Sequence, residues 1–343
     1  MSKPPESRAR PGTPDDARER VTQREFSDAS TRQAPGVPVP PPGVPLPPDV
    51  DPALASAVLP RPYGWGLLPS RWRVRRHPKW WQEAGFILIS YYLYGLVRNS
   101  VGGGVAADCG RPGTLSDLQR VACARGLDIW EFQRAIGTGF ELAVNKWVAE
   151  IEWLATFSNY WYALAHFIVT VGTLIWLYRR HPLQYRGMRT ALYATNALAL
   201  LGYTFYELAP PRFLTQIGFI DTIVRYKTWG SWSSNGVQSI SNQFAAMPSM
   251  HVGWSVWCAI AIVALSPHAW VRWLGALYPV VTFFVIVATA NHFWLDALGG
   301  VVALWLGFVI QRLLSGYNAV DPTVESGHRR YRPPGAHRGS PVT

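Results

Sequence analysis

The chain has 343 residues, of which 49% are hydrophobic and only 15% charged, and its formal net charge is +11 at pH 7. No motif of a nucleic-acid-binding fold accompanies this charge, so the composition argues against a nucleic-acid partner and favours a membrane protein. A large soluble helical bundle is the alternative that the composition leaves open.

Residues 1–70 differ in composition from most of the chain. They contain few large apolar side chains and the proline-rich run PGVPVPPPGVPLPPDVDP. Such a segment cannot bury enough apolar surface to offset its chain entropy, and its prolines favour extended polyproline II structure. We predict a disordered cytoplasmic tail without the apolar core of a signal peptide. A second disordered cytoplasmic tail is predicted for residues 316–343.

A basic segment, residues 71–83, links the first tail to the apolar part of the chain. It begins with RWRVRRHPKWWQ, in which arginine and lysine alternate with tryptophan. We interpret its charge mainly as a signal of membrane topology; that the segment lies along the anionic inner leaflet as an amphipathic element is a further alternative.

Six apolar runs of about membrane length follow. A helix needs about 20 residues to cross the hydrocarbon core, and a helix is the natural form for such a run because it satisfies its own backbone groups. We therefore expect an all-α, polytopic membrane protein in which residues 84–315 form a six-transmembrane-helix bundle. The runs are Ala84–Val101, Tyr160–Tyr178, Met188–Leu208, His251–Leu265, Trp270–Ala290 and Phe293–Leu314.

Basic residues cluster at four places: before the first run, between the second and third, between the fourth and fifth, and at the end of the sixth. Six crossings put these places on one side, which the positive-inside rule makes cytoplasmic. We predict a multi-pass cell-membrane protein with both termini cytoplasmic. Three segments then face outward, namely Gly102–Asn159, Ala209–Met250 and the turn Asn291–His292.

The outward segment 102–159 carries apolar residues at three- and four-residue spacing, which predicts helices. We expect two amphipathic helices at the outer face, broken near Gly137–Gly139. Cys109 and Cys123 both lie in this segment. An oxidising exterior permits a disulfide between them, and two unpaired thiols are the alternative that the sequence leaves open.

The stretch AAMPSMHVGW places His251 at the start of the fourth run, after Pro248 and Ser249. Proline suits the first turn of a helix, and the free N–H groups of that turn attract anions, phosphate above all. Ser249 could add a hydroxyl to such a site, or it could simply cap the helix.

A second polar cluster, ATANHFWLDALGG, contains His292 and Asp296. Four residues apart on a helix, the two side chains share one face, and the carboxylate can accept the imidazole Nδ1–H and strengthen Nε2 as a nucleophile. A purely structural histidine–aspartate pair is the alternative. Gly299 and Gly300 would let a neighbouring helix approach closely.

Arg212 follows two prolines at the outer end of the third run. Its guanidinium is well shaped to hold phosphate, although a single interfacial arginine can also serve only to anchor a helix. Two histidines, an aspartate, an arginine and a helix N-terminus at one rim favour phosphoryl transfer through a phosphohistidine. We expect no metal and no other cofactor, because the arginine and the helix terminus supply the positive field.

The paired motifs PSMH and HFWLD resemble those of the type 2 phosphatidic acid phosphatase superfamily. More narrowly, APPRF, GFIDT, NQFAAMPSMHVGW and NHFWLDALGG resemble its inositol phosphorylceramide synthase-like branch in the bacterial form. The resemblance implies a six-helix core with its active site at the outer leaflet. It also implies that His292 is the nucleophile, Asp296 its orienting partner and His251 the general acid, with Arg212 and Ser249 binding phosphate.

The chain departs from the superfamily pattern at two cations. Phe205 stands where the first motif has a lysine, and Ile286 stands where the third motif has an arginine. Three residues of the outer loop, Arg225, Lys227 and Gln243, are candidates to compensate.

These residues predict a lipid phosphohydrolase or phosphotransferase whose partners are the bilayer and a lipid phosphate substrate, with the oligomeric state left open. The donor would be a phospholipid or a polyprenyl phosphate or diphosphate, and the acceptor water or an inositol or sugar hydroxyl. Two alternatives remain: a membrane cytochrome with His166, His251 and His292 as haem ligands, and a non-catalytic lipid transporter, flippase or scaffold.

Overall fold

A computed structural model describes residues 67–68, 79–100, 108–228 and 244–320, all of them in one compact unit, Pro62–Thr343. The predicted tails lie almost entirely outside the described residues, as do Gln243 and most of the basic segment 71–83. The described part is helical, with one isolated β-bridge between Leu208 and Ala245 and no strand. The all-α prediction is confirmed for these residues.

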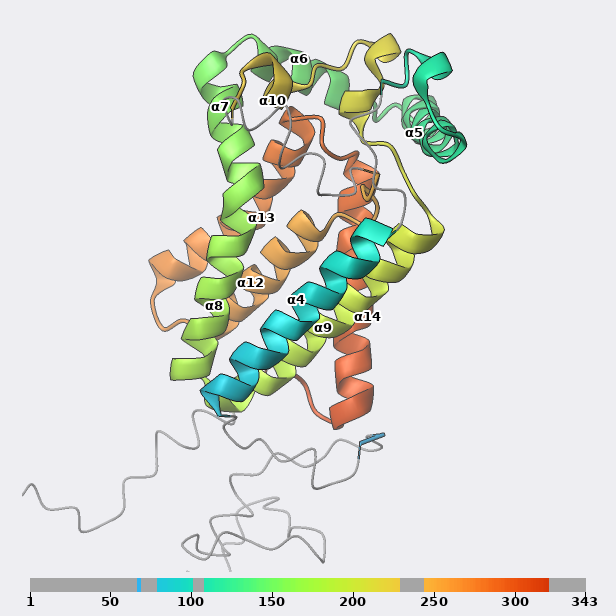
Figure 1. The fold of residues 1–343 in the computed structure, drawn as a ribbon. Coiled ribbons are helices and arrows are strands. Elements are labelled where there is room, and N and C mark those ends of the chain that lie inside the picture. Colours follow the sequence, from blue (N-terminus) through green and yellow to red (C-terminus); the bar gives the residue numbers. More distant parts are fainter. Residues whose placement is uncertain (1–66, 69–78, 101–107, 229–243, 321–343) are drawn as a thin grey trace, which may run out of the picture. The chain divides into compact units, whose positions relative to one another are not determined.

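Each of the six predicted runs forms a helix (Figure 1). Three helical stretches, Glu152–Arg180, Ala269–Ala288 and Trp294–Ser315, are long and apolar enough to cross a membrane, and α12 is apolar but shorter. This is consistent with a membrane protein, and the count of six crossings stays a prediction. The six helices are α4 (Trp80–Ser100), α8 (His166–Arg180), α9 (Pro182–Phe205), α12 (Met250–Leu265), α13 (Ala269–Ala288) and α14 (Trp294–Ser315).

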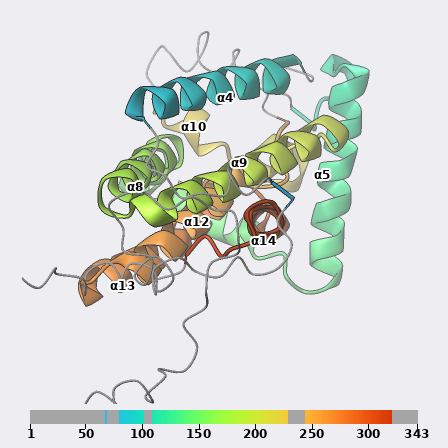
Figure 2. The ribbon, with the colours of Figure 1, turned by 90° about the horizontal axis from the view of Figure 1, so that it is seen from below.

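Helix α12 lies among α8, α9, α13 and α14 and contacts all four (Figure 2). Its Trp257 is fully buried and donates a hydrogen bond to the carbonyl oxygen of Met188, at 2.9 Å. Helix α14 approaches it closely, since a Cβ at Gly300 would lie 2.2 Å from the carbonyl oxygen of Ser249. The predicted close approach at Gly300 is confirmed, and it brings the first turns of α12 and α14 together.

The second predicted run begins earlier in the structure than its apolar letters indicate. Helix α7 (Glu152–Tyr160) continues through a π-helical turn, Trp161–Ala165, into α8. The polar residues that hid this start from the sequence are buried: Asn159 donates to Thr228 Oγ1 and accepts from Thr222 Oγ1, both at 2.7 Å. These bonds join the helix to the segment that carries α10 (Thr222–Arg225).

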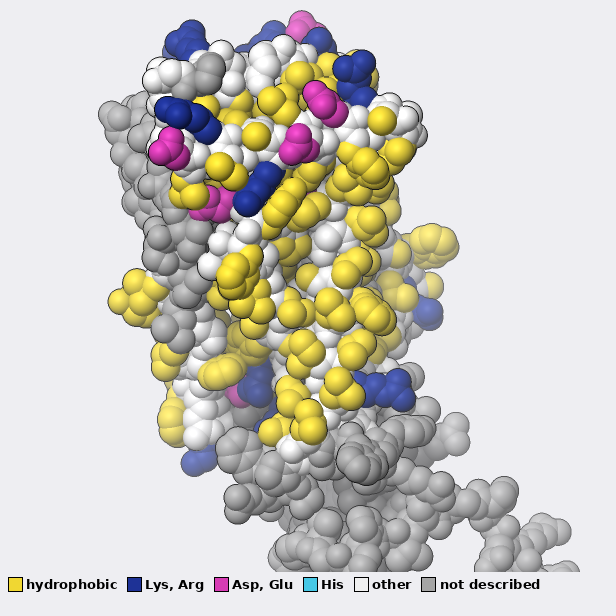
Figure 3. All heavy atoms as spheres, turned by 90° about the vertical axis from the view of Figure 1, so that its right-hand side faces the viewer, with side chains coloured by type: hydrophobic (Ala, Val, Ile, Leu, Met, Phe, Trp, Pro, Cys, Tyr) yellow, Lys and Arg dark blue, Asp and Glu magenta, His cyan; other side chains and the backbone are white. Residues whose placement is uncertain are grey.

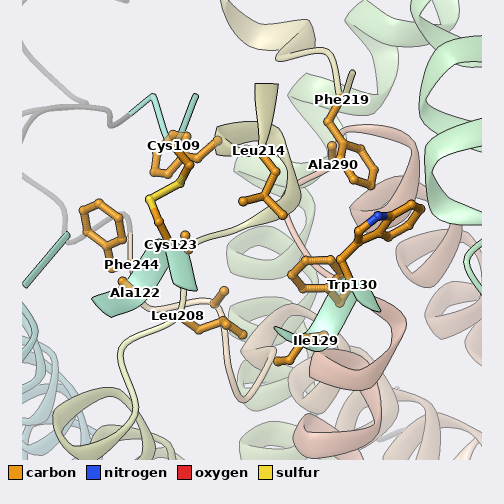
Figure 4. Packing of buried hydrophobic residues seen from close by; sticks show 14 of the residues in the cluster. Cys109, Ala122, Cys123, Ile129, Trp130, Leu208, Leu214, Phe219, Phe244 and Ala290 are labelled. Atoms are coloured by element: carbon orange, nitrogen blue, oxygen red, sulfur yellow. A yellow bond between two sulfur atoms is a disulfide. The ribbon is translucent and has the colours of Figure 1, made fainter. Parts of the chain in front are cut away.

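The segment before α7 forms the two predicted amphipathic helices, α5 (Asp117–Ala135) and α6 (Glu141–Ala149). They are separated at the predicted glycines, where Gly137 has a φ of +74°. A disulfide joins Cys109 to Cys123, so of the two alternatives the structure contains the bridge. Figure 4 shows it at the edge of a buried apolar cluster that α5 shares with residues around Leu208, Leu214 and Phe244.

Large apolar side chains cover much of the bundle surface. Figure 3 shows hydrophobic side chains across the middle of one face, with charged side chains gathered mainly toward its ends. In water such a surface would favour association or aggregation, whereas in lipid it is expected. The soluble-bundle alternative is therefore disfavoured. Examples that are more than half exposed are Ile168, Leu201, Trp270, Trp273, Val280 and Trp305.

Candidate active site

Three loop segments meet at the end of the bundle where α12 and α14 begin, and main-chain hydrogen bonds hold them together. Leu208 N–H donates to the carbonyl of Phe244, Arg212 N–H to that of Ala290, and Ser249 N–H to that of Asp296, each at 2.8 Å. The segments around residues 208–214, 244–251 and 290–296 are thereby fixed side by side. They contain all five residues that the sequence analysis assigned to the site.

His292 does not lie on the helix, as the sequence analysis expected. Helix α14 begins at Trp294 with Phe293 as its N-cap, so His292 sits in the preceding turn, which follows Ala290 at a φ of +53°. Its ring is nevertheless directed at Asp296, with Nδ1 3.4 Å from Oδ2.

A closer partner for the His292 ring is the backbone. Nδ1 lies 2.9 Å from the carbonyl oxygen of Ala246. Both neighbours of Nδ1 are acceptors, so Nδ1 carries the proton and the neutral ring presents a lone pair at Nε2. Nε2 is buried and has no hydrogen-bond partner among the described residues.

Asp296 is fully buried at the third position of α14. Its Oδ2 also accepts the backbone N–H of Phe293, at 2.9 Å, and so satisfies one of the free donors at the helix start. Its Oδ1 has no partner among the described residues. The carboxylate therefore serves the helix and the His292 ring at the same time.

His251 is the second residue of α12, and Ser249 is the N-cap. Pro248 precedes the N-cap, so the expectation that it occupies the first turn is wrong. Ser249 makes no side-chain capping bond, and its buried Oγ has no partner among the described residues. Capping thus does not explain the hydroxyl of Ser249.

Three histidine rings and one tyrosine ring contact one another beside α12. The ring centroids of His251 and His292 are 5.5 Å apart, and those of His251 and His166 are 4.3 Å apart. Tyr162 stacks on His251 at 4.1 Å. A porphyrin cannot fit between rings packed at these distances, which argues against the haem alternative. The sequence analysis missed Tyr162 and gave His166 only as a haem ligand.

Arg212 lies in a short 3₁₀ turn, Pro211–Phe213. Its Nη1 donates to Oδ1 of Asn291 at 2.6 Å, and its Nε lies 3.9 Å from Oδ2 of Asp221. Asn291 in turn donates to Oγ1 of Thr289 at 2.7 Å. The guanidinium is thus held by the residue next to His292, and the sequence analysis had not singled out Asn291.

The positions where the superfamily has a lysine and an arginine carry apolar side chains, Phe205 and Ile286. Ile286 is buried in α13, and Phe205 is 76% exposed at the end of α9. Of the residues suggested to compensate, Arg225 forms an ion pair with Glu150 at 3.3 Å, on the exposed side of α10. Its charge is therefore engaged away from His292.

Helix α6 is hydrogen-bonded to the start of α14. Glu141 is buried and its Oε1 accepts the first N–H group of that helix, from Trp294, at 3.2 Å, as well as a bond from the side chain of Gln133. Burial is the main reason that the pKa of Glu141 is raised, with Asp296 contributing. Trp294 also donates through Nε1 to Thr138, at 3.1 Å. The outer segment is thus bonded directly to the helix that carries Asp296.

A helical bundle with apolar surfaces and a histidine–aspartate–arginine cluster where two helices begin is consistent with a membrane enzyme of the phosphoryl-transfer type. The family model of the PAP2 superfamily matches residues 127–310, more than half of the chain. The protein therefore belongs to the PAP2 superfamily, and this membership indicates a phosphatase-type enzyme that acts on lipid phosphates. Searches of curated proteins and of solved structures gave no significant match.

Proposed function

We propose that the protein is a membrane lipid phosphotransferase or phosphohydrolase that works through a phosphohistidine on His292. The observation that carries this proposal is the environment of the His292 ring. Two acceptors face Nδ1, while Nε2 is buried, unpartnered among the described residues and adjacent to the ring of His251. This is the arrangement that a nucleophilic imidazole needs.

In the first step, the lone pair of His292 Nε2 attacks phosphorus, and the bond between phosphorus and the leaving oxygen breaks. His251 acts as general acid and gives its proton to that oxygen. The non-bridging oxygens are held by the guanidinium of Arg212, the hydroxyl of Ser249 and the free N–H groups at the start of α12. Asp296 stabilises the positive charge that develops on the His292 ring.

In the second step, His251 is neutral and accepts a proton from the acceptor hydroxyl. The acceptor oxygen forms its bond to phosphorus as the bond to His292 Nε2 breaks, and both histidines return to their initial states. Water as acceptor gives hydrolysis, and an inositol or sugar hydroxyl gives transfer. The cover formed by α5 and α6 supports transfer, because excluding water from a phosphoenzyme suppresses hydrolysis.

The donor we propose is a phospholipid or a polyprenyl phosphate or diphosphate whose apolar chains enter from the bilayer. The likeness of APPRF, GFIDT and NHFWLDALGG to the inositol phosphorylceramide synthase-like branch supports an inositol-type acceptor. The distribution of basic residues supports an active site on the extracytoplasmic face of the cell membrane, with both termini in the cytoplasm.

The test is to incubate the purified protein with labelled phospholipids and polyprenyl phosphates, with and without inositol, and to identify the products. The wild type should form an acid-labile phosphoenzyme, and His292→Ala should form none and lose turnover by about 10³-fold or more. A His292→Ala protein that inserts normally and keeps its turnover would refute the nucleophile. Lipid movement across the bilayer that survives His292→Ala but not Arg212→Ala would instead support a flippase.

A further inference from the structure

The helical stretch Glu152–Arg180 has π-helical geometry at one turn, Trp161–Ala165. Single π turns inside α-helices are uncommon and often occur at functional sites. This turn carries Tyr162, and His166 follows it directly as the first residue of α8. Both side chains contact the ring of His251, so the irregular turn lies against the proposed general acid.

The contacts restrain the His251 ring from two directions. Tyr162 stacks on it with a centroid distance of 4.1 Å and an interplanar angle of 20°. His166 meets it at 4.3 Å and 63°, in an edge contact. The Nδ1 atom of His166 is 3.0 Å from the carbonyl oxygen of Tyr162, which can only accept, so Nδ1 donates and the His166 ring is fixed to the same turn.

We propose that Tyr162 is a positioning residue for His251 and that the π turn presents its ring for that purpose. This inference rests on the proposed role of His251 as general acid. A contact to the ring face restrains the plane of the imidazole without using a ring nitrogen, so it persists in both protonation states. The His292 ring is restrained through its Nδ1, where two acceptors fix the proton.

If Tyr162 positions the general acid, its loss should affect substrates differently according to their leaving groups. A misplaced acid harms a reaction whose leaving group needs a proton and spares one whose leaving group departs as a stable anion. Loss of the Tyr162 ring should therefore slow phosphoenzyme formation from an alkyl phosphate lipid much more than phosphoenzyme formation from an aryl phosphate such as p-nitrophenyl phosphate. The second step uses His251 with either substrate, so the comparison is made on the first step alone.

The experiment compares Tyr162→Leu, which removes the flat ring, with Tyr162→Phe, which removes only the hydroxyl. With the alkyl phosphate, the single-turnover rate of phosphoenzyme formation should fall about 10- to 100-fold in Tyr162→Leu and stay within about 3-fold of wild type in Tyr162→Phe, because small misplacements of a catalytic group are costly. With the aryl phosphate both variants should stay close to wild type. Tyr162→Met provides a second ring-free variant if Tyr162→Leu does not fold.

The matched control is Phe157→Leu, which removes a ring from α7 that packs on Trp161 and is 48% exposed. It should show no selectivity between the substrates. Equal losses on both substrates in the ring-free variants, or equal damage from Tyr162→Phe, would overturn the positioning role of Tyr162. The separate variant His251→Ala tests the function itself: if it shows no leaving-group dependence, the general acid is wrong irrespective of Tyr162.

Discussion

Two buried carboxylates at different places along the bundle differ in how many of their oxygens have a hydrogen-bond or ion-pair partner. Near the start of α9, Glu83 accepts a hydrogen bond from Tyr185 on one oxygen, at 2.9 Å, and pairs with Arg189 through the other. At the start of α14, Asp296 uses Oδ2 for both His292 and the N–H of Phe293, while Oδ1 has no partner among the described residues.

The difference lies in the carboxylate itself: both oxygens of Glu83 are bonded, whereas one oxygen of Asp296 has no partner among the described residues. Glu83 has a donor on each oxygen and so ties α4 to α9. Around Asp296, the buried atoms Nε2 of His292 and Oγ of Ser249 also lack partners among the described residues. Buried polar groups are nearly always hydrogen-bonded, so a cluster of exceptions indicates a place where a polar ligand completes the bonding.

Among the variants that test this comparison, Asp296→Asn gives the largest expected effect. The amide keeps the size of the carboxylate but cannot balance the charge that develops on the His292 ring. Turnover should fall by about 10²-fold or more, with the amount of phosphoenzyme falling in parallel. Turnover within a few-fold of wild type would show that the carbonyl of Ala246 orients the ring alone.

Asn291→Asp should have a smaller effect, through Arg212. Asp221 lies 3.9 Å from Nε of Arg212, but Asn291 holds the guanidinium with a neutral oxygen and so does not further offset its positive charge. An aspartate would compete with phosphate for that charge, and KM should rise about 10-fold while kcat changes less. Asn291→Ala removes the bond without adding a charge and is the matched control. A lower KM in Asn291→Asp would contradict this account.

Glu83→Gln tests the structural side. It leaves Arg189 without its countercharge, and thermal unfolding in detergent should show a loss of about 1–3 kcal/mol. Turnover per folded molecule should not change, because the Glu83 pair lies near the start of α9, whereas Tyr203 near its other end contacts Pro248. A specific loss of turnover at equal folded fraction would remove the distinction between the two carboxylates.

Glu141→Gln should give the smallest effect, in the pH dependence of stability. Burial raises the pKa of Glu141 above its ordinary value of 4.5, so folding favours its protonated form. Its contribution is fully present below pH 4.5 and is lost as the pH rises through the raised pKa. In thermal unfolding between pH 4 and 8, Glu141→Gln should therefore lose less stability than the wild type. An unchanged pH slope would contradict the assignment.

The sequence analysis could identify the ionisable side chains of the candidate site, because their residue types are unusual at the ends of apolar runs. The segments with His251, His292, Asp296 and Arg212 meet as expected, because each follows or precedes an apolar run and all fall at the same end. The carbonyl of Ala246 was not predictable, since a backbone acceptor has no side-chain signature. Tyr162 was missed for a related reason: its position depends on a π turn, which apolar periodicity does not encode.

Helix boundaries show the same limit. The start at Glu152 was missed because buried Ser158 and Asn159 interrupt the apolar letters, and the burial of Asn159 is explained only by its bonds to Thr222 and Thr228. The sequence analysis placed His292 on a helix because a helix brings side chains four residues apart onto one face. In the structure, His292 reaches Asp296 from the turn before the N-cap, which gives the same contact without a helix.

The bond between Glu141 and Trp294 joins helix α6 to the first turn of helix α14. Helix α6 cannot lift from α14 without freeing the first N–H of that helix, the same turn that anchors the carboxylate of Asp296. The placement of the Asp296 carboxylate therefore depends on the packing of helix α6, because loss of the Glu141 bond would loosen the same first turn of α14 that positions Asp296.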